Sequence, residues 1–420
     1  FLTTAHASPI LTPVHSILLV WFSLFQLNAV PHSPPKVTLG VDVLFDTDSF
    51  ELVKGKRVGL VTNASGVDGD LVATRVRLAK DKRLNLVQLY SPEHGLDGVA
   101  PAGKALKDSV DKQTGLPVQS LFGGQRAPTL ASLKTLDVLL FDIQGLGSRT
   151  YTYASTMGES MVRAKEAGIP FVVLDRPNPI GGLRFEGPVL TEKRFGFLGW
   201  GPTPVSHGLT MGELARFFNV TKKIGADLHV VKMKGWKRHM MWEDTGLHWV
   251  QTSPAIPQRL QAYYYVATGM VGGVCRNVNE GYGTTSPFER IGAEFITDPY
   301  AFTDGMNAAK LPGVRFIPVI YKPSYSRFRD KTLMGTQLVL TNAGKFEPLR
   351  TALTILTELE RLYPGKTKFK KGWSFNAIWG DPQVKTAIQA GKTPGEIMKT
   401  WSNELATFAK QREQALIYRD

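Results

Sequence analysis

Short apolar runs alternate with amphipathic stretches along the first half of the chain. The apolar runs are rich in valine and leucine, end at polar or Gly/Pro-rich loops, and lie at residues 57–62, 84–90, 136–142 and 170–175. The amphipathic stretches between them have helical periodicity and lie at residues 71–82, 129–135 and 153–167. Apolar runs of this length are typical of strands buried in a parallel sheet. The alternation therefore predicts an α/β fold with a Rossmann-like parallel sheet that helices cover on both faces.

The pattern changes beyond about residue 225, where the alternation fades and tryptophans become frequent. Strand-like runs mix with helical stretches, at residues 314–321, 336–340, 348–362 and 393–410. This mixture predicts a second, smaller α+β domain. We therefore expect three parts: a leader and linker over residues 1–35, a Rossmann-like domain over 36–240 and the α+β domain over 241–420.

An N-terminal leader segment is expected because charged residues are absent from the start of the chain. Residues 1–35 carry no charged side chain, and residues 16–29 form an apolar stretch that prolines follow. Such a stretch is short for a membrane span and suits the core of a signal peptide, with Ala29 as the last residue before cleavage. We expect export to the periplasm or the extracellular space, without a stable membrane span in the mature chain. A retained membrane anchor is the alternative.

The composition excludes several classes of protein. The chain has 420 residues, 50 Lys and Arg against 36 Asp and Glu, and one cysteine, Cys275. A single cysteine excludes an intrachain disulfide and a cysteine-rich zinc module. The basic residues are scattered singly and in pairs, which favours a solvated basic surface over a nucleic-acid interface. The chain contains no dinucleotide-binding or P-loop motif and no His-Glu-x-x-His spacing, so we expect neither a cofactor nor a metal site.

Polar residues follow each predicted strand, and ligands bind at the carboxyl ends of the strands in open parallel sheets. These residues are Asn63 after the first strand, Glu93 and His94 after the second, Asp142, Gln144, Arg149 and Tyr151 after the third, and Asp175, Arg176 and Asn178 after the fourth. Amides, carboxylates, arginines and tyrosines together suit a polyhydroxylated, anionic ligand. A carboxyl group beside a histidine, as at Glu93 and His94, suits general acid or base catalysis. The structural alternative is that the carboxylates cap helices or pair with the arginines.

Two further polar residues lie outside these loops. His207 precedes a helix that Thr210 is expected to cap, with Glu213 completing a capping box. His207 is either a site residue or a partner in a loop hydrogen bond. Glu280 lies in a Gly-rich turn of the second domain, from which it either reaches the site or simply forms the turn.

Several short motifs follow one another along the chain: Gly-Leu-Val-Thr-Asn at 59–63, Ser-Pro-Glu-His-Gly at 91–95, Thr-Gly-Leu-Pro-Val at 114–118, Phe-Asp-Ile-Gln at 141–144, Tyr-Thr-Tyr at 151–153, Asp-Arg-Pro-Asn-Pro at 175–179, Glu-Gly-Pro-Val-Leu at 186–190, His-Gly at 207–208, Glu-Gly at 280–281 and Gly-Thr-Thr at 283–285. In this order they resemble a bacterial family of exo-β-N-acetylmuramidases of peptidoglycan recycling, formerly a domain of unknown function. The resemblance runs from about residue 40 to residue 420. Together the motifs are highly specific for this family.

The resemblance implies a Rossmann-like catalytic domain, a smaller C-terminal domain and a cleft between them. It implies a glycosidase that releases β-N-acetylmuramic acid, or a related amino sugar, from the non-reducing ends of peptidoglycan fragments. Glu93 would be the acid/base residue, with His94 beside it and Asp142 as the partner carboxyl. The sugar site would be lined by Asn63, Gln144, Arg149, Tyr151, Asp175, Arg176, Asn178, His207 and Glu280. A retaining, an inverting and a substrate-assisted mechanism all stay open, as does the oligomeric state.

The chain departs from the family pattern at four positions. Gly145 replaces a usual aspartate, Thr150 a common aromatic residue, Ala64 a frequent histidine and Tyr282 a common arginine. These changes leave open a second function, that of a catalytically inactive glycan-binding protein of the cell envelope. An envelope esterase or amidase is a third, weaker option.

Overall fold

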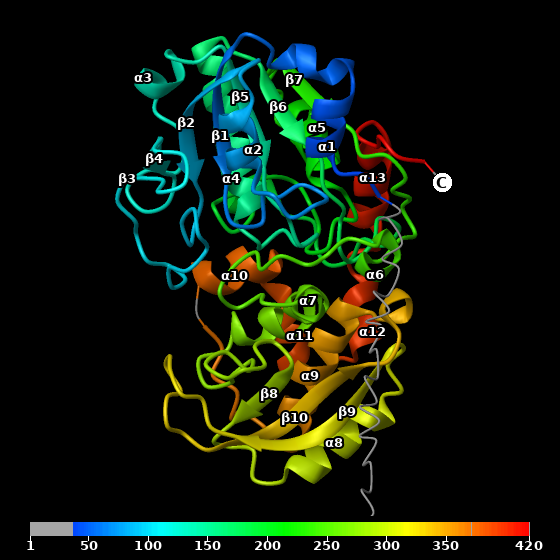
Figure 1. Cartoon of the computed structure of the whole chain (residues 1–420). Helices are drawn as coiled ribbons and strands as arrows, with labels where there is room; N and C mark the ends of the chain where they lie inside the picture. The colour runs from blue at the N-terminus through cyan, green and yellow to red at the C-terminus, as the bar shows by residue number, and fades with distance from the viewer. Residues whose placement is uncertain (1–36, 371, 420) are drawn as a thin grey trace, which may run out of the picture. The chain divides into compact units, whose positions relative to one another are not determined.

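A seven-stranded sheet organises the first part of the computed structural model, which describes residues 37–370 and 372–419 (Figure 1). Its order is β3-β4-β2-β1-β5-β6-β7, and each neighbouring pair is parallel except β3 with β4. The strands are β1 (Arg57–Thr62), β2 (Asn85–Ser91), β3 (Ser109–Val110), β4 (Pro117–Ser120), β5 (Val138–Asp142), β6 (Phe171–Leu174) and β7 (Leu228–Val231). Four of them coincide with the predicted apolar runs, and the predicted α/β fold is confirmed.

Helices cover both faces of this sheet because successive residues of a strand point to opposite sides. Leu139 of β5 belongs to the hydrophobic cluster that contains residues of α4 and α5, whereas Leu140 belongs to the cluster that contains residues of α1 and α2. The helices are α1 (Gly40–Asp46), α2 (Thr74–Lys80), α3 (Leu130–Leu133), α4 (Tyr153–Ala167) and α5 (Met211–Thr221). We call this sheet and its helices the first lobe.

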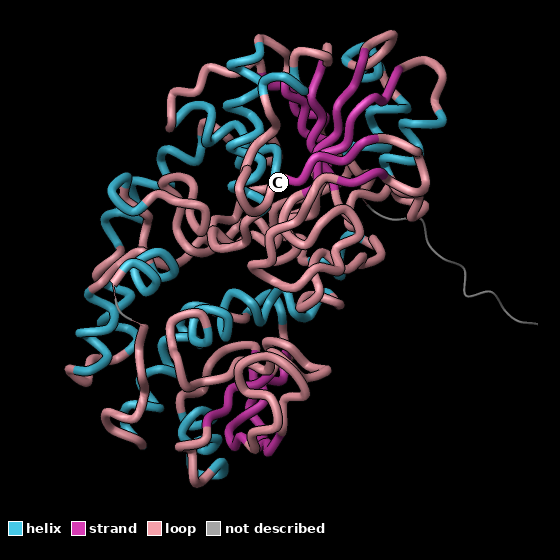
Figure 2. Tube along the Cα trace, turned by 90° about the vertical axis from the view of Figure 1, so that its left-hand side faces the viewer, coloured by secondary structure: helices cyan, strands magenta, loops and turns pink. Residues whose placement is uncertain are grey.

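The second lobe is built on a three-stranded antiparallel sheet of order β8-β10-β9. Its strands are β8 (Arg290–Ala293), β9 (Val314–Tyr321) and β10 (Leu333–Leu340). The remaining helices are α6 (Trp242–Thr245), α7 (Arg259–Gly272), α8 (Pro299–Ala308), α9 (Pro348–Leu362), α10 (Trp373–Trp379), α11 (Gln383–Gln389), α12 (Pro394–Lys399) and α13 (Ser402–Glu413). Figure 2 shows the strands of the two sheets as separate groups, with helices and loops between them.

The C-terminal segment returns from the second lobe to the first. The helix predicted over residues 393–410 is divided into α12 and α13, and Trp401 in the break is buried against Trp379. Helix α13 then lies against α5 of the first lobe (Figure 1). Beyond it, the hydroxyl of Tyr418 donates to the buried carboxylate of Asp175 at 2.6 Å. The C-terminal segment is therefore part of the first lobe's packing.

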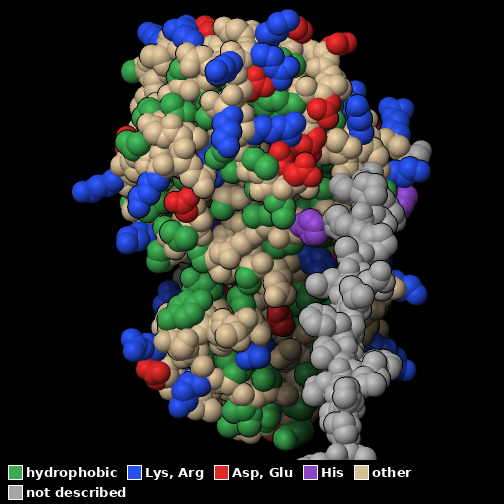
Figure 3. Space-filling model, viewed as in Figure 1, with side chains coloured by type: hydrophobic (Ala, Val, Ile, Leu, Met, Phe, Trp, Pro, Cys, Tyr) green, Lys and Arg blue, Asp and Glu red, His purple; other side chains and the backbone are tan. Residues whose placement is uncertain are grey.

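Lys and Arg side chains are spread over the face of the molecule in Figure 3 rather than gathered in one patch. In the part of the chain that the structure describes, no helix is both long and apolar enough to cross a lipid bilayer. The predicted leader over residues 1–35 lies outside the described residues.

Candidate active site

A pocket of about 340 Å³ lies where the first lobe meets α7 and the turn around residues 280–288. The first lobe contributes the loops after β2 and β5, the two strands that flank β1 where the winding of the sheet changes direction. Crevices of this kind are the usual ligand sites of open α/β sheets, and the volume falls within the roughly 300–1,000 Å³ of small-molecule pockets. The polar residues that line the pocket are Glu93, His94, Thr150, Tyr151, Thr152, Tyr153, Ser253, Tyr265, Glu280 and Tyr282.

Glu93 is held by two hydrogen bonds, one to each oxygen of its carboxyl group. The backbone N–H of Gly103 donates to Oε1 at 2.9 Å, and the hydroxyl of Thr152 donates to Oε2 at 2.8 Å. Both bonds use Glu93 as the acceptor, as a carboxylate requires. Because Thr152 immediately precedes the 15-residue helix α4, the carboxyl group lies at the positive end of this helix.

His94 follows Glu93 in a strained turn. Its φ is 72°, in the left-handed region that residues other than glycine seldom adopt. Nδ1 lies 2.7 Å from the carbonyl oxygen of Ala100. Because a carbonyl oxygen only accepts, this contact places the hydrogen on Nδ1 and leaves Nε2 as the acceptor nitrogen of the neutral ring.

Four aromatic rings form a wall of the pocket that crosses from one lobe to the other. The ring centroids of Tyr153 and Tyr151 are 4.7 Å apart, those of Tyr151 and Tyr265 are 5.6 Å apart, and those of Tyr265 and Phe288 are 5.1 Å apart, all in edge-to-face geometry. Burial raises the pKa of Tyr265 to about 12, so its hydroxyl stays protonated. The wall thus combines apolar ring faces with hydrogen-bonding hydroxyls.

Glu280 enters the pocket from the second lobe. Its side chain crosses Gly272, the last residue of α7, where an added Cβ would lie 2.0 Å from Oε2 of Glu280. Within the described chain, the carboxyl group of Glu280 forms no hydrogen bond or ion pair with another residue. Burial raises the pKa of Glu280, and the nearby charges of Arg327 and Lys370 oppose that effect. The pocket therefore contains a second carboxyl group, whose pKa lies above its usual value.

Asn63 lies behind the pocket and supports one of its walls. Its Nδ2 donates to the carbonyl oxygen of Thr252 at 3.2 Å, and the hydroxyl of Tyr153 donates to the same oxygen at 2.6 Å. The hydroxyl of Tyr151 donates to Oγ1 of Thr252 at 2.7 Å. Thr252 precedes residues 253–256, which line the pocket. Asn63 and both tyrosines therefore fix the position of this segment.

Asp142 has contacts of another kind. It is fully buried in an ion pair with Arg176, with Nε 2.5 Å from Oδ1 and Nη2 2.9 Å from Oδ2. The hydroxyl of Thr74 donates to Oδ2 at 2.5 Å. Neither member of the pair is among the described residues that line the pocket with Glu93. The catalytic role of Asp142 and the sugar contact of Arg176 stay predictions, and their contacts are those of a buried structural ion pair.

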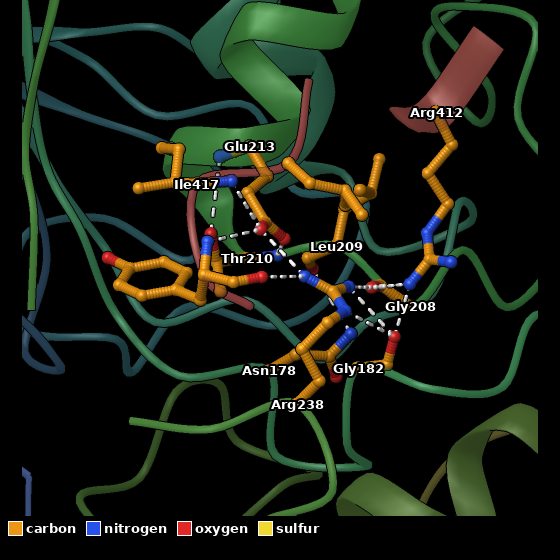
Figure 4. A network of polar contacts seen from close by, with 12 residues as sticks. Asn178, Gly182, Gly208, Leu209, Thr210, Glu213, Arg238, Arg412 and Ile417 are labelled. Atoms are coloured by element: carbon orange, nitrogen blue, oxygen red, sulfur yellow. Dashed lines mark hydrogen bonds and ion pairs between the residues drawn. The ribbon is translucent and has the colours of Figure 1, made fainter. Parts of the chain in front are cut away.

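Asp175, Asn178 and His207 contact the protein itself at the end of β6. Burial raises the pKa of Asp175 to about 6, although the hydroxyl of Tyr418 donates to it. Nδ1 of His207 accepts from the backbone N–H of Leu209 at 3.1 Å, and burial lowers the pKa of His207 to about 3. Nδ2 of Asn178 donates to the carbonyl oxygen of Leu209 at 3.1 Å (Figure 4).

A buried polar network next to these residues fastens the C-terminal segment (Figure 4). The predicted capping box of Thr210 and Glu213 is present at the start of α5. The Oε1 atom of Glu213 accepts from Nη1 of Arg238 at 2.7 Å and from the backbone N–H of Ile417 at 3.0 Å. Nη2 of Arg412 donates to the carbonyl oxygen of Gly208 at 3.0 Å. The loops after β6 are therefore tied to α13 and the residues that follow it.

The two remaining predicted residues also bond to the protein. Nε2 of Gln144 donates to the carbonyl oxygens of Gly145 and Pro177, both at 2.8 Å. Arg149 lies behind the pocket, where Nη2 donates to the carbonyl oxygen of the lining residue Ile378 at 2.9 Å. Burial lowers the pKa of Arg149 to about 9. Among the described residues that line the pocket there is no arginine or lysine.

The four departures from the family pattern do not all concern the pocket. Thr150 and Tyr282 line it, and Oγ1 of Thr150 lies 3.2 Å from the hydroxyl of Tyr265. Gly145 is buried elsewhere, and a Cβ at this position would lie 2.6 Å from Sδ of Met211. The methionine therefore occupies the space that a larger residue at 145 would need.

Sequence reasoning missed the contribution of α7. Tyr265, Gly269 and Gly273 are spaced four residues apart, so they lie on one face of this helix and its C-cap. All three line the pocket. That spacing of a tyrosine and two glycines was the available signal. Thr152 was also missed, although it lies inside the Tyr-Thr-Tyr motif at residues 151–153.

The pocket thus combines two carboxyl groups, an imidazole and several tyrosine and threonine hydroxyls. These groups suit acid–base hydrolysis and the binding of a polar, ring-shaped substrate. Over residues 37–370 and 372–419, no group of three or more His, Cys, Asp or Glu side chains is placed to hold a metal ion.

Known proteins resemble the chain over both lobes. The family description "Exo-beta-N-acetylmuramidase NamZ, N-terminal" matches residues 58–260, and "Exo-beta-N-acetylmuramidase NamZ, C-terminal" matches residues 263–418. The peptidoglycan beta-N-acetylmuramidase NamZ of Bacillus subtilis (strain 168) is 42% identical over 384 residues, which are 91% of this chain and 92% of that protein. A crystal structure of a DUF1343 family protein from Bacteroides fragilis NCTC 9343 is 36% identical, with a TM-score of 0.85 over 92% of this chain and 100% of that chain. A second such protein from the same organism is 26% identical, with a TM-score of 0.72 over 91% and 99% of the two chains.

Proposed function

Because the chain belongs to the exo-β-N-acetylmuramidase family, and is accordingly an exo-acting glycosidase, we propose that it releases N-acetylmuramic acid from the non-reducing ends of peptidoglycan fragments. We further propose that Glu93 is its acid/base residue. One observation carries this proposal. The pocket between the lobes is lined by the doubly hydrogen-bonded carboxyl group of Glu93, by His94 and by an aromatic wall.

The lining of the pocket supports a sugar as the substrate. Tyrosine and threonine hydroxyls provide hydrogen bonds for sugar hydroxyls and for a 2-acetamido group, and the aromatic rings provide apolar contact. A volume of about 340 Å³ supports action on one terminal sugar at a time. The lactyl carboxylate of muramic acid would accept its hydrogen bonds from hydroxyls, because the described lining contains no arginine or lysine and Nε2 of the neutral His94 ring is itself an acceptor.

The surroundings of Glu93 support a role in proton transfer. Gly103 and Thr152 fix the orientation of its carboxyl group, and positioned carboxyl groups of this kind contribute roughly 10²–10⁴-fold to catalysis. In hydrolysis the group would exchange a proton with the attacking water or with the glycosidic oxygen. The Nδ1 contact of His94 with the carbonyl oxygen of Ala100 would fix the orientation of its ring in the same pocket lining.

The substrate is tested with a chromogenic β-N-acetylmuramide and the matching β-N-acetylglucosaminide, incubated side by side with the purified protein. Release from the muramide alone is the expected result. Thr150 and Tyr282, which line the pocket, favour the second candidate function, a glycan-binding protein without turnover. Absence of release from both compounds, with heat of binding to peptidoglycan fragments in calorimetry, would establish that second function instead.

We also propose that the chain is exported to the periplasm or the extracellular space. The support is the uncharged segment over residues 1–35 with its apolar stretch at 16–29. Cell fractionation followed by mass spectrometry of the N-terminus tests this. A mature chain that begins after Ala29 outside the cytoplasm is expected, and a cytoplasmic chain that keeps its leader would contradict export.

A further inference from the structure

The two carboxyl groups of the pocket lie at opposite kinds of helix end. Glu93 accepts a hydrogen bond from Thr152, which precedes α4, so it lies at the positive end of that helix. Glu280 crosses Gly272, which is the last residue of α7, so it lies at the negative end of that helix. Helix ends stabilise opposite charge, and α4 therefore favours a carboxylate at 93 while α7 disfavours one at 280.

The hydrogen bonds of the two carboxyl groups also favour a carboxylate at 93 over one at 280. The carboxyl group of Glu93 accepts two hydrogen bonds from other residues, whereas that of Glu280 accepts one only from its own backbone N–H and none from another described residue. The charged and titratable groups that face Glu280 are Arg327, Lys370, Cys275, Tyr282 and Tyr321. Of the two cations, Arg327 lowers the pKa of Glu280 more than Lys370 does. Nη2 of Arg327 donates to the carbonyl oxygens of Cys275 and Val278 at 3.1 and 3.0 Å. Arg327 and Lys370 lower the pKa of Glu280 through their charges, but neither forms an ion pair with its carboxyl group in the described structure.

Resting on the muramidase function proposed above, we propose that Glu280 is the proton donor to the glycosidic oxygen and that Glu93 is the base toward water. Two carboxyl groups whose surroundings favour different protonation states are the usual basis of such a division. Glu280 gives its proton to the glycosidic oxygen as the bond from C1 to that oxygen breaks, and the departing sugar leaves as an alcohol. Water loses a proton to Glu93 and supplies the hydroxyl that bonds to C1. The proton then returns from Glu93 to Glu280 through solvent, which restores both groups to their starting states. One water molecule is consumed for each glycosidic bond that is broken.

The leaving group distinguishes this role from a binding role. A 2,4-dinitrophenyl β-N-acetylmuramide needs no proton to release its phenolate, whereas the disaccharide of N-acetylmuramic acid and N-acetylglucosamine needs one. Glu280→Gln is expected to lose about 10²–10⁴-fold in kcat on the disaccharide and less than about 10-fold on the dinitrophenyl compound. Glu294→Gln, which changes an exposed glutamate of the same lobe, is the matched control and should keep both activities.

Each outcome decides the question. Equal losses on both substrates with a raised KM would assign Glu280 to binding only, and unchanged activity on both would remove it from the mechanism. A wild-type protein that is silent on both muramides would overturn the proposed function itself, and this inference with it. Should Glu280→Gln fail to fold, the pH profile of the wild type decides. Loss of disaccharide turnover, but not of dinitrophenyl turnover, as the pH rises is then the expected result, and parallel profiles would contradict the proposal.

Discussion

The side chain of Glu280 occupies the space that a Cβ atom at Gly272 would need. An added Cβ would lie 2.0 Å from Oε2 and 2.2 Å from Cδ of this glutamate. Real atoms do not approach so closely, so the carboxyl group keeps its place in the pocket only because residue 272 is glycine. This relationship makes the position of Glu280 testable without any change to its chemistry.

Gly272→Ala is expected to lower kcat by at least about 10-fold while the protein stays folded, because displacement of a reacting group by about 1 Å costs up to roughly 10²-fold. Steady-state kinetics on a muramide disaccharide measure this effect. Gly395→Ala is the control, since that glycine lies in α12 with no atom within 4 Å of an added Cβ. Full activity in Gly272→Ala would show that the pocket does not depend on the position of Glu280.

Thr152→Val tests how Glu93 is oriented. The variant keeps the shape of the side chain and removes the hydroxyl that donates to Oε2 at 2.8 Å. A hydrogen bond to a charged group contributes about 1.5–3 kcal/mol, so kcat is expected to fall about 10–100-fold with KM within a few-fold. Thr407→Val, on the exposed side of α13, should leave both constants unchanged. A kcat equal to that of the wild type would mean that this bond does not hold Glu93 for reaction.

Asp142→Asn is expected to act on stability. The change leaves the guanidinium of Arg176 buried without its carboxylate, and breaking a buried ion pair in this way costs about 3–5 kcal/mol. Urea unfolding measures the loss. Activity per folded molecule should stay close to that of the wild type, because neither residue lines the pocket in the described structure. A variant of normal stability without turnover would return Asp142 to the mechanism.

Acid is expected to destabilise the fold through His207. Burial lowers its pKa from 6.5 to about 3, so between these values the unfolded chain binds a proton that the folded chain does not. The free energy of unfolding should therefore fall by about 1.4 kcal/mol for each pH unit below 6.5 because of this residue. Asp175 and Glu186, whose pKa values are raised to about 6 and about 7, act in the opposite direction.

The comparison of wild type with His207→Asn isolates this contribution, because both proteins contain the two acids. The asparagine also keeps an acceptor for the N–H of Leu209. Urea unfolding between pH 7 and pH 4 should show a shallower loss of stability in the variant. Parallel curves for the two proteins would contradict the neutral, buried state of His207.

Much of the first lobe was predictable because its strands are continuous apolar runs. Residues 57–62 form β1 as expected, and α4 has its predicted bounds, with Gly168 in the left-handed conformation as its C-cap. The missed strands are short, and β3 and β7 carry exposed or half-buried residues without a clear period. The break between α12 and α13 has no sequence signal, and Trp401 in this break is buried against Trp379, a contact between residues of different elements.

The site was predicted only in part, because loop position does not determine where a side chain points. Tyr151 lines the pocket, as Glu93 does, and both come from loops chosen for their place after a strand. Asp142 and Arg176 come from equivalent positions, but they pair with each other, which is the structural alternative that such residues always have. The contribution of Tyr265 depends on how α7 packs against the first lobe, and that is a long-range relationship.

The central claim is that Glu93 takes part in the chemistry of sugar release, and Glu93→Gln tests it most directly. Turnover of a chromogenic β-N-acetylmuramide and the calorimetric Kd for a muramide product are measured for this variant and for the wild type. A loss of about 10²–10⁴-fold in kcat, with a Kd within a few-fold of the wild-type value, is the predicted result. Unchanged turnover would remove Glu93 from the mechanism and contradict the assignment of this pocket as the active site.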